Sequence, residues 1–62
     1  MNKIEVTYLL SCSYKGNLAK VNITVCGTTI KQAQHKLPAK LKYLVAQGYK
    51  VLQETIESIR EV

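Results

Sequence analysis

Hydrophobic and polar residues alternate with a period of two over the first 26 residues of the chain. The apolar set of the first segment is Ile4, Val6, Tyr8, Leu10, Cys12 and Tyr14, with Leu9 an apolar exception among the intervening polar residues. The apolar set of the second segment is Ala19, Val21, Ile23 and Val25. Because successive side chains of a strand point to opposite faces, this pattern predicts two strands that each turn one face to a core.

A tight turn is expected between the two strands. Gly16-Asn17 suits a two-residue type II′ turn, which has glycine at its first position. The strand partners that this turn predicts are Tyr8 with Val25, Leu10 with Ile23, Cys12 with Val21, and Tyr14 with Ala19. Each apolar residue then lies opposite another apolar residue, whereas a slip by one residue would place valines opposite serines and threonines.

Apolar residues of the next segment recur at spacings of three and four, which predicts a helix over about residues 29–47. The stripe consists of Ile30, Ala33, Leu37, Leu41, Leu44 and Val45. Thr28 or Thr29 can cap the start of this helix, and Gly48 can end it in a left-handed conformation. Pro38 lacks the N–H that the fourth preceding carbonyl needs, so we expect a kink there or a division into two shorter segments.

The last segment, residues 49–62, is compatible with two structures. Tyr49, Val51 and Thr55 alternate as in a strand, but the apolar positions from Val51 to Val62 fit a helical stripe at least as well. A two-stranded hairpin is only marginally stable without a third strand or a helical cover. We therefore expect a third strand that begins at Tyr49.

The expected fold class is α+β. The order is β-β-α-β, with a three-stranded antiparallel sheet in the order 2-1-3 covered by one Pro-kinked helix, and β-β-α-α is the alternative. A chain of 62 residues is long enough for one small core, so we expect a single domain. Its parts are a hairpin (3–27), a helix (about 29–47) and a C-terminal strand or helix (49–62).

The charges of the chain are segregated. The segment from Val6 to Gln53 has no carboxylate side chain but contains Lys15, Lys20, Lys31, Lys36, Lys40, Lys42 and Lys50. Three of the four glutamates lie in the last nine residues, and the net charge of the chain is +5. Such segregation favours a polyanion or an acidic protein surface as the partner.

Residues of the predicted helix that point away from its apolar stripe form the first candidate site. When helical positions are placed about 100° apart, small and aromatic side chains lie between two rows of lysines. The candidate partner-binding residues are Lys31, His35, Lys36, Ala39, Lys40, Lys42 and Tyr43. A face flanked by lysines is also common on helices that contact only solvent.

A second candidate surface lies on the polar face of the hairpin. It consists of Leu9, Lys20 and Asn22, and it adjoins the second strand, which is expected to form an open edge of the sheet. Pairing of such an edge across a two-fold axis would form a homodimer.

Catalytic chemistry is not expected. The chain has no Asp, Trp or Phe and only one His, and it contains no recognisable nucleotide-binding, hydrolase or metalloprotease motif. Cys12 and Cys26 are predicted on opposite faces of one hairpin, with Cys26 opposite Thr7, so a bond between them is excluded. We expect no enzyme activity, no metal and no cofactor.

The expected function is that of a small basic binding protein in the cytoplasm. No apolar run is long enough to span a membrane, and the first residues lack the pattern of a secretory signal. We expect an inhibitor or adaptor that docks on an acidic surface of a protein, of the short, motif-free kind typical of phages and mobile elements. The alternative is a nucleic-acid-binding module that tolerates many sequences, since lysines rather than arginines supply the charge.

Overall fold

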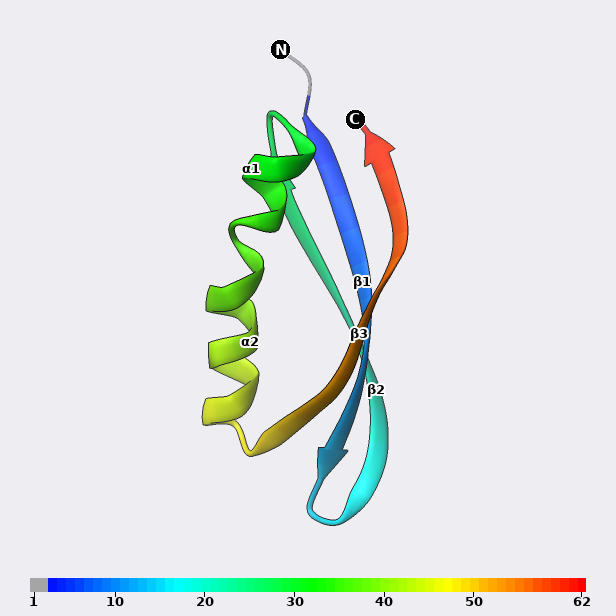
Figure 1. Ribbon diagram of the computed structural model, residues 1–62, viewed down its shortest axis with the longest axis vertical. Coiled ribbons are helices and arrows are strands. Elements are labelled where there is room, and N and C mark those ends of the chain that lie inside the picture. The colour runs from blue at the N-terminus through cyan, green and yellow to red at the C-terminus, as the bar shows by residue number, and fades with distance from the viewer. Residues whose placement is uncertain (1–2) are drawn as a thin grey trace.

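The computed structural model describes residues 3–62. The elements are β1 (Ile4–Tyr14), β2 (Asn17–Gly27), α1 (Ile30–Gln34), α2 (Leu37–Ala46) and β3 (Tyr49–Glu61). The strands form one antiparallel sheet in the order β2-β1-β3, and both helices lie on the same side of it (Figure 1). The predicted α+β fold is confirmed, and the C-terminal segment is a strand rather than a helix.

The core lies between the central strand and the helices. The even-numbered residues of β1 point toward the helices, and Val6, Leu10 and Cys12 have no exposed surface. Strand β1 is paired on both edges, so its inward side chains are enclosed by both neighbouring strands as well as by the helical layer. Among residues 3–62, the buried set is Val6, Tyr8, Leu10, Cys12, Val25, Ala33 and Leu37.

The hairpin register differs from the predicted one by two residues. The turn residues are Lys15 and Gly16, whose φ angles of 50° and 80° are those of a type I′ turn rather than the expected type II′. Tyr8 therefore pairs with Ile23 instead of Val25, and every other partner of β1 moves by the same amount. A shift of two residues leaves each side chain on its predicted face, so the alternation is unaffected.

The predicted Pro-kinked helix consists of two segments joined by a short turn. Thr29 caps α1, since its Oγ1 accepts a hydrogen bond of 3.1 Å from the N–H of Gln32. The Gln32 side chain reaches back and its Oε1 accepts from the N–H of Thr28 at 2.6 Å, which fixes the start of the helix. Pro38 lies in the first turn of α2, where its missing N–H removes no intrahelical bond. Gly48, with a φ angle of 100°, follows the end of α2.

The apolar stripe of the helical region is narrower than predicted. Ala33 and Leu37 are buried and Leu41 is half-buried, but Ile30 and Val45 are 42% and 60% exposed. Val45 lies about 100° around the helix from Leu44, which places it at the margin of the face that Leu37, Leu41 and Leu44 turn to the sheet. Ile30 is the first residue of α1 and lies at the end of the helical layer.

Strand β3 is irregular. Its register with β1 shifts between Thr7 and Tyr8 and again between Ser11 and Cys12. The shifts arise because Glu57 and Leu52 are extra residues without a partner on β1, as in β-bulges. The inward side chains Ile56 and Ile59 pair beside the core but remain 42% and 46% exposed.

Candidate partner-binding surface

The helical layer presents a basic surface to solvent. We call Lys31, His35, Lys36, Ala39, Lys40, Lys42 and Tyr43 the basic helix surface; all seven are exposed. The structure thus places each predicted residue of the first candidate site on the outside of the layer that covers the sheet. Tyr43 is the most prominent apolar member, with 65% of its surface exposed.

The break between the helices divides this surface into two parts. Lys31 belongs to α1, whereas His35 and Lys36 lie in the connecting turn and the other members lie on α2. On α2, the leucines at positions 37, 41 and 44 face the sheet, so Ala39 and Tyr43 lie on the opposite side of the helix. The residues of this surface therefore lie on two segments that meet at the turn.

An open hollow of about 410 Å³ lies where the two segments meet. Its lining residues are Lys31, Gln34, His35 and Pro38. Gln34 and Pro38 were absent from the candidate site inferred from the sequence, although the proline that breaks the helix marks the position. The ammonium group of Lys31 and the side-chain amide of Gln34 are hydrogen-bond donors suited to a carboxylate.

The positive charge of the basic helix surface is not compensated within the described part of the chain. Over residues 3–62 the ion pair found joins Arg60 Nη2 to Glu5 Oε1 at 2.7 Å, and it lies on the sheet. The helices have no acidic residue in their first turns, and the glutamates are confined to β1 and β3. The lysines are consequently available to a partner that carries negative charge.

The second candidate surface occupies the face of the sheet that the helices leave open. Leu9 on β1 lies directly opposite Asn22 on β2, and Lys20 pairs with Ser11. Leu9 is half-buried, while Lys20 and Asn22 are exposed. The structure thus brings the three predicted residues together on neighbouring strands.

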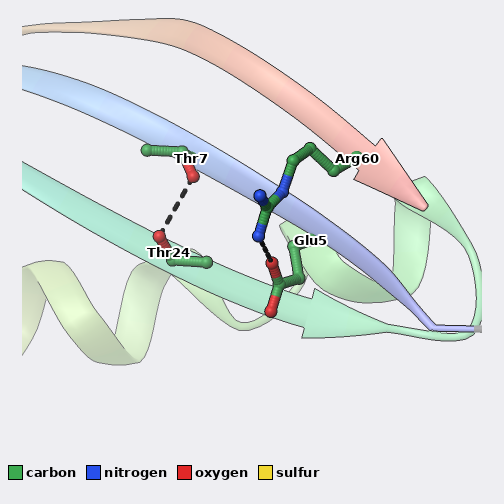
Figure 2. A network of polar contacts seen from close by, with 4 residues as sticks. All are labelled: Glu5, Thr7, Thr24 and Arg60. Carbon is green, nitrogen blue, oxygen red and sulfur yellow. Dashed lines mark hydrogen bonds and ion pairs between the residues drawn. The ribbon is translucent and has the colours of Figure 1, made fainter. Parts of the chain in front are cut away.

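Polar contacts connect the three strands beside this second surface. The hydroxyl oxygens of Thr7 and Thr24 are 3.0 Å apart, and Arg60 reaches across from β3 to Glu5 (Figure 2). The hydrogen bond from Arg60 holds the pKa of the Glu5 carboxyl below its usual value, with its positive charge and that of Lys3 acting in the same direction. These groups pair with one another across the sheet.

The two cysteines lie on opposite faces of the hairpin and are both free thiols. Cys12 is buried in the core, and Cys26 is half-buried on the open face, opposite Glu5 rather than the expected Thr7. Over residues 3–62 no group of three or more potential metal ligands comes together. No helix in this range is long and apolar enough to cross a membrane.

Comparisons of the chain with protein families, with curated proteins and with solved structures found no match.

Proposed function

We propose that the protein is a small, non-enzymatic binding protein that docks its basic helix surface on an acidic surface of a protein partner, as an inhibitor or adaptor. One observation carries the proposal: exposed lysines without carboxylate partners surround an exposed tyrosine on the outer side of the helical layer.

Tyr43 is suited to be the anchor of the contact. Tyrosine is enriched among the few residues that supply most of the binding energy of protein interfaces, because its ring buries a large area and its hydroxyl keeps a hydrogen-bonding partner. Ala39, one turn before Tyr43, is small and allows a partner to approach the helix closely. The lysines around this pair would steer an acidic partner and accelerate association more than they would tighten the complex.

The proposal favours protein over nucleic acid because of the kinds of residues present. The surface contains lysines and a histidine but no arginine, so it lacks the rigid guanidinium fork that is best suited to recognise guanine. One tyrosine on the surface offers little stacking to a single strand, where successive aromatic side chains are usual.

Charge and truncation variants of the protein, measured against one purified partner, test the proposal. A partner captured by the tagged protein from its native host is purified, and its affinity is measured for the wild type, Tyr43→Ala, Lys40→Glu and the control Lys20→Glu. Lys20 is also exposed but belongs to β2. We expect Tyr43→Ala to weaken binding by about tenfold or more, as for a hot spot, and Lys20→Glu to have little effect.

Fluorescence anisotropy with labelled single- and double-stranded DNA and RNA separates the two kinds of partner. Under the proposal, binding of nucleic acid is weak and free nucleic acid does not compete with the protein partner. Micromolar binding that falls steeply with salt, with an equal loss for each lysine changed to glutamate, would overturn the proposal in favour of nucleic acid.

A further inference from the structure

We propose that the free edge of β2 pairs with β2 of a second copy of this chain, antiparallel and centred on Asn22. The two three-stranded sheets then become one continuous six-stranded sheet in a symmetric homodimer. This inference is independent of the function proposed for the helices, because it uses the free edge of β2 and not the outer side of the helical layer.

The outer edges of β2 and β3 are not equally suited to pair with a strand of another chain. Strand β2 keeps one unbroken register with β1 over all of its eleven residues. Strand β3 carries two register shifts and five charged residues, and both features protect an edge from pairing. Strand β2 has a single charged residue, Lys20, so its edge is the one left regular and nearly neutral.

The hydrogen-bonding groups of β2 that face outward follow from the turn. Tyr14 and Asn17 flank a two-residue turn, and such flanking residues exchange hydrogen bonds with each other. Hydrogen-bonded and non-hydrogen-bonded pairs alternate along an antiparallel ladder, so the odd-numbered residues of β2 bond to β1. Lys20, Asn22 and Thr24 therefore direct their N–H and C=O groups to the free edge.

The sequence of β2 is self-complementary when Asn22 faces Asn22 of the second copy. Asn22 is the middle residue of β2, so this register pairs the strand over its whole length. The residues that exchange hydrogen bonds with the second copy are the ones whose N–H and C=O groups point outward. Val21 then lies beside Ile23 of the second copy, and both are half-buried side chains that gain cover. Lys20 lies beside Thr24 of the second copy, so the two lysines do not face each other.

The helices leave this edge accessible. Helix α1 packs close to the last residue of β2, where a Cβ on Gly27 would lie only 2.8 Å from the backbone nitrogen of Ala33. The middle of β2 and the hairpin end lie away from α1 (Figure 1). A two-fold axis perpendicular to the sheet at Asn22 places the helices of both copies on one side of the six-stranded sheet, with each α1 near an opposite end of the shared ladder.

A proline at the centre of the edge tests the pairing. Asn22→Pro removes an N–H that β1 does not use, and proline is tolerated on an edge strand when its nitrogen faces solvent. By sedimentation velocity we expect a dimer for the wild type and a monomer with an unchanged circular dichroism spectrum for Asn22→Pro. Glu54→Pro makes the same change on the outer edge of β3 and should leave the dimer intact. A monomeric wild type at concentrations up to about 1 mM, or a dimer that survives Asn22→Pro, would overturn the proposal.

Disulfide cross-linking tests the register without relying on the proline variant. Asn22→Cys is made in a Cys26→Ser background. In the proposed dimer, the Cα atoms of residue 22 in the two copies would lie about 5.5 Å apart, within the range that a disulfide spans. Lys20→Cys in the same background is the control, since the two introduced cysteines would be four residues, or about 13 Å, apart along the ladder. We expect rapid cross-linking of the first variant only. Equal rates for both variants would contradict the proposed register.

Discussion

The rings of Tyr14 and Tyr49 stack with their centroids 4.5 Å apart and their planes inclined by 25°. The two residues are direct partners at the end of β1 and the start of β3, so the stack joins the hairpin to the strand that follows the helices. Lys15 Nζ lies 5.3 Å from the centroid of the Tyr14 ring, on the same end of the sheet. Gly48 approaches this ring closely, since a Cβ at its position would lie 3.5 Å from Tyr14 Cε1.

We expect Tyr14 and Tyr49 to be energetically coupled. Stacked aromatic pairs contribute about 0.5–1.5 kcal/mol beyond the area that they bury. Urea unfolding of Tyr14→Leu, Tyr49→Leu and the double variant gives the coupling energy directly from a thermodynamic cycle. If the losses of unfolding free energy in the two single variants add up to the loss in the double variant, each ring acts by burial alone.

A methyl group at position 27 should separate α1 from the sheet. The nearest atom to a Cβ on Gly27 is the backbone nitrogen of Ala33, at a distance that no relaxed contact allows. We expect Gly27→Ala to lower the free energy of unfolding by about 1–3 kcal/mol, as for overpacked cores, and to speed hydrogen exchange in α1. Cys26→Ala, a change at the adjacent residue, is the control and should leave α1 protected. A Gly27→Ala protein as stable as the wild type would contradict this account.

The two thiols should differ in their reactivity. Cys12 has no exposed surface and points into the core, whereas Cys26 is half-buried on the open face. With a thiol reagent such as DTNB, we expect one equivalent to react promptly in the native protein and the second to react only as the domain opens. The Cys26→Ser variant should lose the prompt phase and keep the slow one. Prompt reaction of both thiols would show that β1 is accessible in the native state.

The ion pair between Glu5 and Arg60 should make the stability of the folded protein depend on pH. Because Arg60 lowers the pKa of Glu5 in the folded state, the unfolded chain takes up the proton first as the pH falls. The contribution of the pair is complete above the ordinary pKa of a glutamate and is lost as the pH falls through the lowered folded-state value. We expect the Tm of the wild type to exceed that of Glu5→Gln at about pH 7 and the difference to shrink toward about pH 2.

Direct titration checks the cause of this dependence. Arg60→Gln removes the hydrogen-bond donor, so the NMR titration midpoint of the Glu5 side chain should rise relative to the wild type. An unchanged midpoint would show that Arg60, which is itself 71% exposed, does not hold the carboxylate in solution.

Much of the candidate site could be predicted from residue order because it lies on local structure. Exposure of Lys40 and Tyr43 follows from the spacing of the leucines on α2, and the division of the helix follows from Pro38. The hollow could not be predicted in this way. Gln34 is brought beside Pro38 by the turn between the helices, whose geometry depends on how each segment packs on the sheet.

The sequence by itself determined which side chains face the core. The period of two in β1 and β2 assigned Leu10 and Cys12 inward and Thr7 outward, and the structure agrees at each of these positions. It also indicated where the helical region begins and ends, since the cap at Thr29 and the glycine at position 48 are local signals. These features need only neighbouring residues, so propensity and periodicity are sufficient to read them.

Only the tertiary structure decided the strand partners. A shift of two residues keeps every side chain on its face, so periodicity cannot distinguish Ile23 from Val25 as the partner of Tyr8. The turn selects the register: Lys15 and Gly16 both adopt positive φ in a type I′ geometry, which matches the twist of the paired strands. The extra residues Leu52 and Glu57 likewise become visible only when β3 is paired with β1, because a bulge is a relation between two strands.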